Sequence, residues 1–235
     1  FAPICGIVGE MGFQPHIVGR KIAACRLWNR VLGLDDNRLT KIILLNDIEK
    51  GGKFSEYIMS ICDDVNQLAN FDNKRSIDLS QLQNKCMDNY TAAWKDQINA
   101  KPKLRLYRKF KENFGVEKYC KFYLPRFQRS LLAKLRLGIL PLRLETGRFV
   151  GEDVTQRICK ICNTQVEDEE HFLFKCNYYT DERNNFLNSL NLDNTDEFLN
   201  KNTETKLQHL FENNLFKLGS FIEQIYIKRR QYFYS

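Results

Sequence analysis

The helical character of the chain is clearest in residues 125–138, which read PRFQRSLLAKLRLG. A proline suits the first turn of a helix, because its nitrogen needs no hydrogen-bond partner there, and Gly138 can end the helix. Phe127, Leu131 and Leu135 recur every four residues and form one apolar stripe, which we expect to be buried. The cations of the same stretch should stay outside: Arg126, Arg129, Lys134 and Arg136.

Apolar residues recur at spacings of three and four over most of the remaining chain. The expected helices are residues 17–32, 38–49, 54–68, 79–98, 104–114 and 181–190, and one long closing helix that contains Leu207 to Ile225. Residues 139–150 contain Pro141 and Gly147 and should be extended or looped. No alternating strand pattern separates the helices, so we expect a mostly α, multi-helix fold.

The composition is ordinary for a globular protein. The 235 residues are 43% hydrophobic and include only 12 Gly and 5 Pro, which argues against long disorder and against a fibrous repeat. No apolar run reaches the roughly 18 residues of a membrane helix, so we expect no membrane partner. Residues 1–9 do not resemble a signal peptide, and the chain begins without Met. We therefore expect a part of a longer polypeptide.

Positive charge is concentrated between residues 101 and 148. Fourteen lysines and arginines lie there against three acidic residues, whereas the whole chain carries a net charge of only +7. Such a stretch is typical of a polyanion site, since each Lys or Arg that docks on a phosphate releases condensed counterions. Interleaved aromatic rings could stack on unpaired bases: Tyr107, Phe110, Phe114, Tyr119, Phe122, Tyr123 and Phe127. The alternatives are that the rings pack in the core and that the cations form a solvated face.

Four residues have metal-ligand spacing: Cys159, Cys162, His171 and Cys176 form C-x2-C-x8-H-x4-C. Three thiolates and an imidazole make a closed tetrahedral shell for Zn²⁺, which leaves no position for a reactive water and predicts a structural ion. A C-x-x-C redox pair and simple free thiols are the alternatives. A redox pair usually begins a helix in a βαβ context, which is absent here, and it would leave His171 and Cys176 unexplained.

The remaining cysteines lie on apolar faces and are expected to be small buried hydrophobic residues: Cys5, Cys25, Cys62, Cys86 and Cys120. His16 and His209 have no ligand-type neighbours in the sequence and are expected to be ordinary helix or surface residues. Reduced cysteines beside a zinc site favour a nuclear or cytoplasmic location.

Several stretches resemble one known family. They are Gly9-Glu10-Met11-Gly12-Phe13, Leu27-Trp28-Asn29-Arg30, Asp35-Asp36-Asn37-Arg38-Leu39-Thr40-Lys41, Lys101-Pro102-Lys103-Leu104-Arg105, Arg129-Ser130-Leu131-Leu132-Ala133-Lys134-Leu135-Arg136-Leu137-Gly138 and Leu140-Pro141-Leu142-Arg143-Leu144-Glu145-Thr146-Gly147-Arg148. With the cysteine–histidine quartet, they resemble the region that follows the polymerase core in reverse transcriptases of animal non-LTR retrotransposons. The resemblance covers roughly residues 1 to 180.

The resemblance implies four segments: a thumb-like helical region over residues 1–100, a basic helical linker over 101–150, a CCHC zinc knuckle over 151–180, and C-terminal helices over 181–235. Such a module would hold template RNA or target DNA, with a reverse transcriptase core in cis upstream of residue 1. The chain lacks the Tyr-x-Asp-Asp motif of the polymerase, so we expect it to be non-catalytic as given. The candidate phosphate contacts are Lys103, Arg105, Arg108, Lys109, Arg126, Arg129, Lys134, Arg136, Arg143 and Arg148.

Two other functions stay open. In the first, the knuckle and the C-terminal helix form a docking face for a protein partner, and the basic stretch meets an acidic protein. Its surface anchors would be Leu215, Leu218, Ile222 and Ile225, although we expect these four side chains to pack inside the fold. In the second, the chain is a residual restriction-like nuclease, for which the acids after the knuckle are Asp181, Glu182, Asp193, Asp196 and Glu197, without a Pro-Asp dipeptide.

Overall fold

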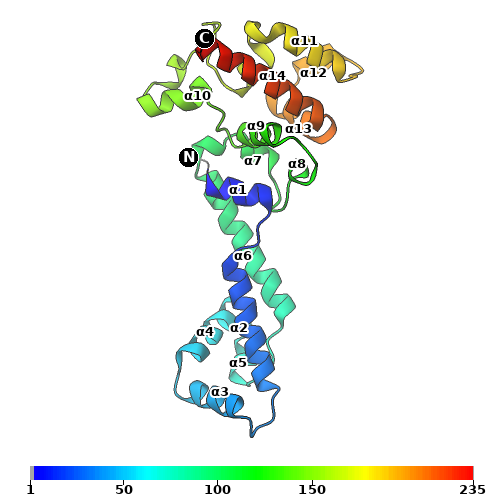
Figure 1. Cartoon of the computed structure of the whole chain (residues 1–235). Coiled ribbons are helices and arrows are strands. Elements are labelled where there is room, and N and C mark those ends of the chain that lie inside the picture. The colour runs from blue at the N-terminus through cyan, green and yellow to red at the C-terminus, as the bar shows by residue number, and fades with distance from the viewer. Residues whose placement is uncertain (1–2, 235) are drawn as a thin grey trace. The chain divides into compact units, whose positions relative to one another are not determined.

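The computed structural model describes residues 3–234, and helices dominate this range. The described residues form no β-strand, only two isolated antiparallel bridges, Met11 with Val116 and Ile158 with Val166. The expected mostly α fold is therefore confirmed (Figure 1). Among the helices of this range, none has both the length and the apolar composition needed to cross a bilayer.

The chain folds into two compact units. The small unit is Gln14–Asp96, and the large unit combines the residues before Gln14 with those from Gln97 onward. The boundary falls within one helix, α6 (Leu79–Asn99). The four segments expected from the sequence do not follow this division, because residues 101–150, 151–180 and 181–235 belong to one unit and α1 (Ile4–Met11) joins them.

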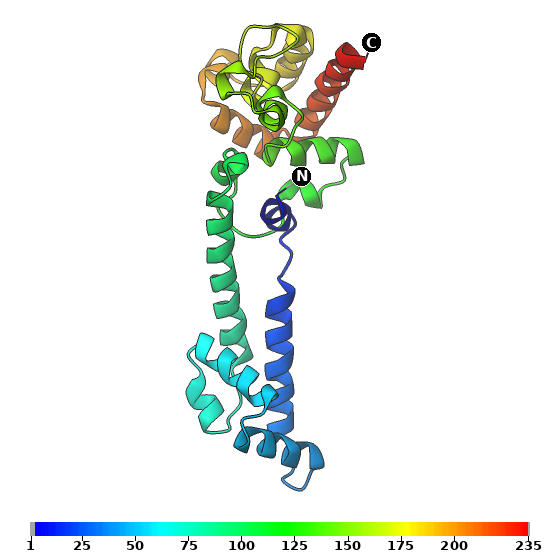
Figure 2. The ribbon, with the colours of Figure 1, turned by 90° about the vertical axis from the view of Figure 1, so that its left-hand side faces the viewer.

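The small unit is built around a buried tryptophan. Its helices are α2 (His16–Leu32), α3 (Leu39–Glu49), α4 (Lys53–Asp64), α5 (Leu68–Asp72) and most of α6. Trp28 of α2 stacks on Phe71 with ring centroids 5.1 Å apart, and its indole N–H donates to the carbonyl of Arg75 at 3.2 Å. Figure 2 shows α3, α4 and α5 gathered at the C-terminal end of α2.

The cysteines of the small unit belong to its core, as expected. Cys25, Cys62 and Cys86 are buried in one cluster with Trp28. Burial raises the pKa of Cys25 to about 12 and that of Cys62 to about 11, because a thiolate is poorly solvated there. These residues behave as small apolar side chains.

The large unit packs its helices around the last one. The helices are α1, α7 (Tyr107–Phe110), α8 (Lys118–Lys121), α9 (Arg126–Arg136), α10 (Arg143–Thr146), α11 (Thr180–Ser189), α12 (Thr195–Asn200), α13 (Thr203–Asn213) and α14 (Leu215–Tyr234). Contacts of α14 with α9 and α11 hold the unit together, and Phe186 stacks on Phe221 with centroids 4.3 Å apart.

The four apolar side chains that a protein-interaction face on the C-terminal helix would need as surface anchors pack inside the fold, as expected. Leu215, Leu218, Ile222 and Ile225 are all buried in the core of the large unit, between α14 and its neighbours. These apolar side chains stabilise the fold, and none of them is available to a partner protein.

Three expected elements differ in extent. The helix over 104–114 is reduced to a 3₁₀ turn, Pro102–Leu104, and the short α7, because Lys111 has an extended ψ of 87°. Residues 139–150 contain α10 and a further 3₁₀ turn where a loop was expected. The long closing helix is two helices, since Asn214 ends α13 and its carbonyl accepts from the Leu218 N–H to begin α14.

Gly138, which follows α9, allows a test of the local fold. Its φ is +61°, and a Cβ atom there would lie 2.6 Å from the carbonyl oxygen of Lys103. Gly138→Ala should therefore lower the free energy of unfolding of the large unit by more than about 1 kcal/mol, measured by thermal or urea unfolding followed by circular dichroism. Gly19→Ala is the control, because Gly19 lies inside α2 with nothing within 4 Å of the added Cβ. Equal stability of both variants would contradict this explanation.

Candidate metal centre and basic surface

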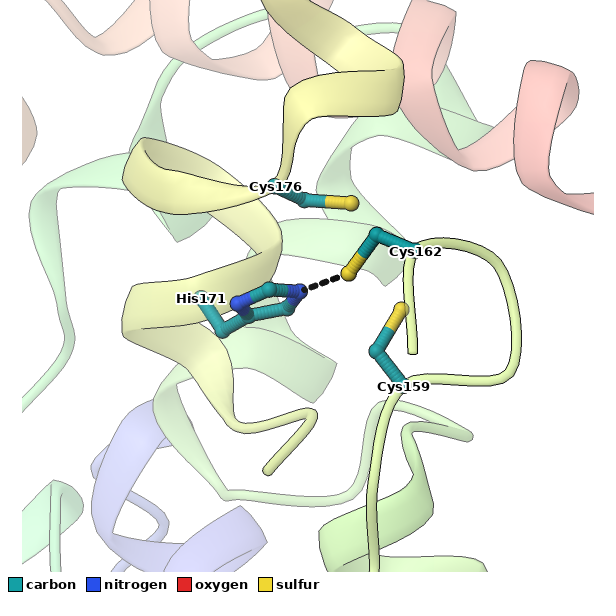
Figure 3. Close-up of side chains that lie close together, drawn as sticks. All are labelled: Cys159, Cys162, His171 and Cys176. Atoms are coloured by element: carbon teal, nitrogen blue, oxygen red, sulfur yellow. Dashed lines mark hydrogen bonds between the residues drawn. The ribbon is translucent and has the colours of Figure 1, made fainter. Parts of the chain in front are cut away.

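Four side chains of the large unit converge on one point (Figure 3). The ligand atoms of Cys159, Cys162, His171 and Cys176 all lie within 4.8 Å of one another, and the Cys162 Sγ is 3.2 Å from His171 Nε2. Sulfur and nitrogen ligands of one zinc ion, with bonds of about 2.0–2.3 Å, stand somewhat less than 4 Å apart. The four residues predicted from spacing therefore come together and could hold a metal ion.

A tight turn presents the first two cysteines. The Cys159 N–H donates to the Gln165 carbonyl and the Asn163 N–H donates to the Cys159 carbonyl, each at 2.8 Å. Asn163 adopts a φ of +56°, a conformation that asparagine tolerates better than most residues. The antiparallel bridge between Ile158 and Val166 closes the turn. Both sulfurs consequently face the same side of the loop.

A single turn of π-helix, His171–Lys175, presents the other two donors. The Asp168 carboxylate accepts from the His171 N–H at 2.7 Å, and the Cys176 N–H donates to the His171 carbonyl at 2.8 Å. The Arg183 guanidinium donates to the carbonyls of Leu173 (3.0 Å) and Cys176 (2.5 Å). These contacts fix the turn that places an imidazole and a thiol on one face.

The surroundings favour the thiolate form at two of the three cysteines, Cys159 and Cys162. A hydrogen bond with Cys176 lowers the pKa of Cys159 well below its ordinary value, although burial acts in the opposite direction. The same hydrogen bond, with burial, raises the pKa of Cys176. Burial also acts to raise the pKa of Cys162, but hydrogen bonds with Thr164 outweigh it, and the net shift is downward. Thiolate is the form of cysteine that binds metals.

The centre is enclosed by the core of the large unit. Cys159, His171 and Cys176 are buried, and Cys162 is half-buried. Phe172 and Tyr179, which flank the second pair of donors, pack edge to face at 5.4 Å. His171 Nδ1 is buried and, within the described residues, has no hydrogen-bond partner. An ion bound here would be shielded by protein on most sides.

One buried carboxylate links this centre to α14. Glu167 lies between the two donor pairs and is 1% exposed. It accepts from Arg229 Nε at 2.8 Å and Nη2 at 3.0 Å, and from the backbone N–H of Arg143 at 2.7 Å. The loop that carries the donors is therefore attached to the C-terminal helix by a buried ion pair.

Arg136 is not a phosphate contact, contrary to the sequence prediction. Its side chain is 4% exposed and forms ion pairs with Glu10 (3.0 Å) and Glu117 (3.1 Å). Its guanidinium also lies 5.0 Å from the ring centroid of Phe211. The arginine was expected on the outer face of α9, but it serves as an internal link between α1, the turn before α8, and α9.

Five other predicted contacts are already paired with carboxylates. The pairs are Lys103–Glu145, Arg105–Glu169, Lys109–Glu204, Arg143–Glu152 and Arg148–Glu145. Arg108 donates to the Asn99 carbonyl at 2.9 Å, and Arg129 to the Leu124 carbonyl at 3.0 Å. Arg126 is exposed and Lys134 is half-buried, both on α9. The ten cations therefore do not form one uniform phosphate surface.

Residues 118–129, which we call the basic segment, keep their cations on the surface. Lys118, Lys121, Arg126 and Arg129 are exposed, and the segment contains no acidic residue. Phe122, Tyr123 and Phe127 are exposed in the same segment, with Tyr123 at 93%. Tyr107 and Tyr119, by contrast, are core residues, as the alternative interpretation of the rings proposed. Lys118 and Lys121 were not among the ten candidates, although the sequence shows no acid between residues 118 and 129.

The acids that follow Cys176 in the sequence form no comparable centre. The quartet is the one group of three or more ligand-type side chains within residues 3–234. Of the five candidate acids, Glu182 pairs with Lys228 at 2.7 Å and Glu197 with Lys201 at 3.2 Å.

Comparison of the chain with protein-family models, with curated proteins and with solved structures gives no match in any of the three. A functional assignment must therefore be argued from the chemistry of the site itself.

Proposed function

We propose that this chain is a zinc-stabilised nucleic-acid-binding module, related to the region that follows the polymerase core in non-LTR retrotransposon reverse transcriptases. Its role would be to hold template RNA or target DNA, without catalysis of its own. The observation that carries this proposal is the basic segment, an acid-free run of exposed cations and rings in the unit that also contains the metal centre.

Zinc is the ion that suits the quartet best. Three sulfur donors and one imidazole match the ligand preferences of Zn²⁺, and hard cations such as Mg²⁺ and Ca²⁺ prefer oxygen ligands. With all four positions supplied by protein, the ion would be structural. It would hold the turn at Cys159 and the π-turn at His171 together. Regular secondary structure in this part of the chain is short, so the ion would supply a link that backbone hydrogen bonds do not.

The basic segment offers both contacts that single-stranded nucleic acid needs. Its cations can neutralise phosphates, and exposed rings such as Tyr123 can stack on bases, which contributes about 1–3 kcal/mol per base. A solvated face without a binding role normally mixes charges of both signs.

Binding should depend on the basic segment and on salt. The variant K118Q/K121Q/R126Q/R129Q should bind single-stranded RNA or DNA about 10²-fold more weakly than the parent chain, because it loses four phosphate contacts. The affinity of the parent should itself fall on the order of 10²-fold between about 50 and 200 mM salt. Fluorescence anisotropy of a labelled oligonucleotide measures both effects.

The matched control removes the same charge from the small unit: K50Q/K53Q/K85Q/K95Q, at four exposed lysines. It should bind within a few-fold of the parent. A polyglutamate competitor tests the rival function, in which the cations meet an acidic protein. Equal losses in both quadruple variants, or displacement by polyglutamate at the same charge concentration as by RNA, would refute the proposal.

The proposed parentage has its own test. If the chain belongs to a reverse transcriptase, the reading frame upstream of residue 1 should encode a palm with the Tyr-x-Asp-Asp turn. The nuclease alternative predicts that the purified chain nicks plasmid DNA in the presence of Mg²⁺. Neither test depends on the binding measurements.

A further inference from the structure

A pocket in the large unit lies beside the metal centre and was not foreseen from the sequence. It has a volume of about 430 Å³, within the range of small-ligand sites. Three parts of the chain line it: the start of α10 with Arg143, the knuckle turn with Lys160, and the last turns of α14. Figure 1 shows α10 close to the C-terminal end of α14.

The lining of the pocket is cationic. Arg143, Lys160, Arg229 and Arg230 all contribute, and no carboxylate lies among the described residues that line it. The acids that hold two of these arginines lie behind them: Glu152 pairs with Arg143, and Glu167 binds Arg229 in a bidentate manner.

These pairings fix the guanidinium groups in place. Arg143 Nε is buried and has no hydrogen-bond partner among the described residues, so one strong donor of this lining is unsatisfied within the protein. An unsatisfied buried donor is costly, and an anion that reaches it would remove that cost.

Two rings line the same pocket. Tyr226 is half-buried, and Phe233 is 39% exposed with the Arg229 guanidinium 4.8 Å from its ring centroid. Cations beside flat rings form the combination that recognises a phosphate together with its attached base.

One ring contact joins the pocket to the basic segment. Phe127 of that segment packs edge to face against Tyr226 of the pocket, with centroids 6.0 Å apart. A strand that follows the segment can therefore reach the pocket. A base inside a duplex cannot stack on these rings, because its faces are already covered by its neighbours.

We propose that this pocket binds one nucleotide, with its phosphate against Lys160 and Arg230, next to the carboxylate-paired Arg143 and Arg229, and with its base against Phe233. The further step, in which this nucleotide is one unit of a bound single strand, rests on the function proposed above. A free mononucleotide has the same chemistry, and the experiment separates the two sources.

The first experiment measures binding of a labelled single strand of about 16 nucleotides, and of the corresponding duplex, to the full chain. K160Q/R230Q should weaken single-strand binding about 10²-fold and duplex binding at most a few-fold, since roughly tenfold is lost per charge-assisted contact. The control K175Q/K201Q removes two exposed lysines of the same unit and should change both by a few-fold at most. Zinc content must stay stoichiometric in K160Q/R230Q, because Lys160 lies between two candidate ligands. Unchanged single-strand affinity, or equal losses for both ligands, would overturn the proposal.

The second experiment works without any polynucleotide. Both native tryptophans belong to the small unit, so Phe233→Trp places a reporter in the pocket that difference spectra can isolate. Adenosine monophosphate should quench this emission at a lower concentration than either adenosine or inorganic phosphate. When K160Q/R230Q is introduced into the Phe233→Trp chain, adenosine monophosphate should lose this advantage over the other two ligands.

The two experiments separate the possible failures. Quenching by the mononucleotide in a chain that binds no RNA or DNA would leave the nucleotide pocket standing and refute the proposed function. If the chain binds single strands, but the mononucleotide does not quench and K160Q/R230Q has no effect, the proposed function stands and the nucleotide pocket is refuted.

Discussion

If the quartet holds the structural zinc ion that we propose, replacement of Cys162 by serine should release this ion and unfold much of the large unit. Structural zinc contributes about 10–16 kcal/mol of apparent binding energy in small zinc domains, and removal of one thiolate forfeits much of it. Cys162 contacts both His171 Nε2 and Thr164 Oγ1, so the loss also releases the turn that follows it. Atomic emission should show less than stoichiometric zinc, and the circular dichroism melt of the large unit should move to a much lower temperature.

Cys120→Ser is the matched control, because Cys120 is a half-buried cysteine of the same unit that is no member of the quartet. It should keep one zinc per chain. Tryptophan emission comes only from the small unit and monitors that unit separately. A Cys162→Ser chain with stoichiometric zinc and an unchanged melting temperature would refute the ligand assignment.

Arg136→Met should destabilise the large unit by about 3 kcal/mol or more, because it leaves the buried Glu10 carboxylate without its partner. If Arg136 contacted phosphate, as the sequence predicts, the Arg136→Met chain would instead keep its stability and bind nucleic acid more weakly. Urea unfolding combined with anisotropy titration of the folded variant distinguishes the two. We expect the affinity of folded Arg136→Met to stay within about twofold of the parent.

Arg129→Met provides the comparison on the same helix. Arg129 is exposed on α9, and its replacement removes one hydrogen bond, to the Leu124 carbonyl. It should therefore lower the free energy of unfolding by at most about 1 kcal/mol while weakening nucleic-acid binding. A double variant, E10L/R136M, should recover part of the lost stability, since a buried ion pair can often be replaced by apolar side chains. Similar stability of the Arg136→Met and Arg129→Met chains would show that the buried ion pairs contribute little.

The helical core could be predicted from the sequence because periodicity reports which face of a helix is buried. Of the expected stripe on α9, Leu131 and Leu135 are fully buried, and so are most apolar residues of the series from Leu207 to Ile225. Phe127 is 38% exposed, contrary to expectation, because it lies in the first turn of α9, at the edge of the core. The break at Asn214 was missed, since the apolar positions continue in register on both sides of it and only the backbone hydrogen bonds reveal the interruption.

The metal quartet was predictable because its spacing is local, with all four donors inside eighteen positions of the sequence. Which cations are paired with carboxylates could not be predicted from the sequence. Arg136 is separated from Glu10 by 126 positions and Lys109 from Glu204 by 95, and no pattern in the sequence links residues so far apart. Charge density alone therefore overestimated the phosphate-binding surface.

The buried pair of Glu167 and Arg229 limits how this protein can be dissected. A fragment that stopped near residue 180 would retain all four donors, yet it would strand the Glu167 carboxylate in the interior with its counter-charge cut away. The cysteine–histidine loop should consequently not fold as an independent domain when it is transferred to another protein. A truncated protein that is meant to keep the four metal-ligand candidates folded must also include the C-terminal helix.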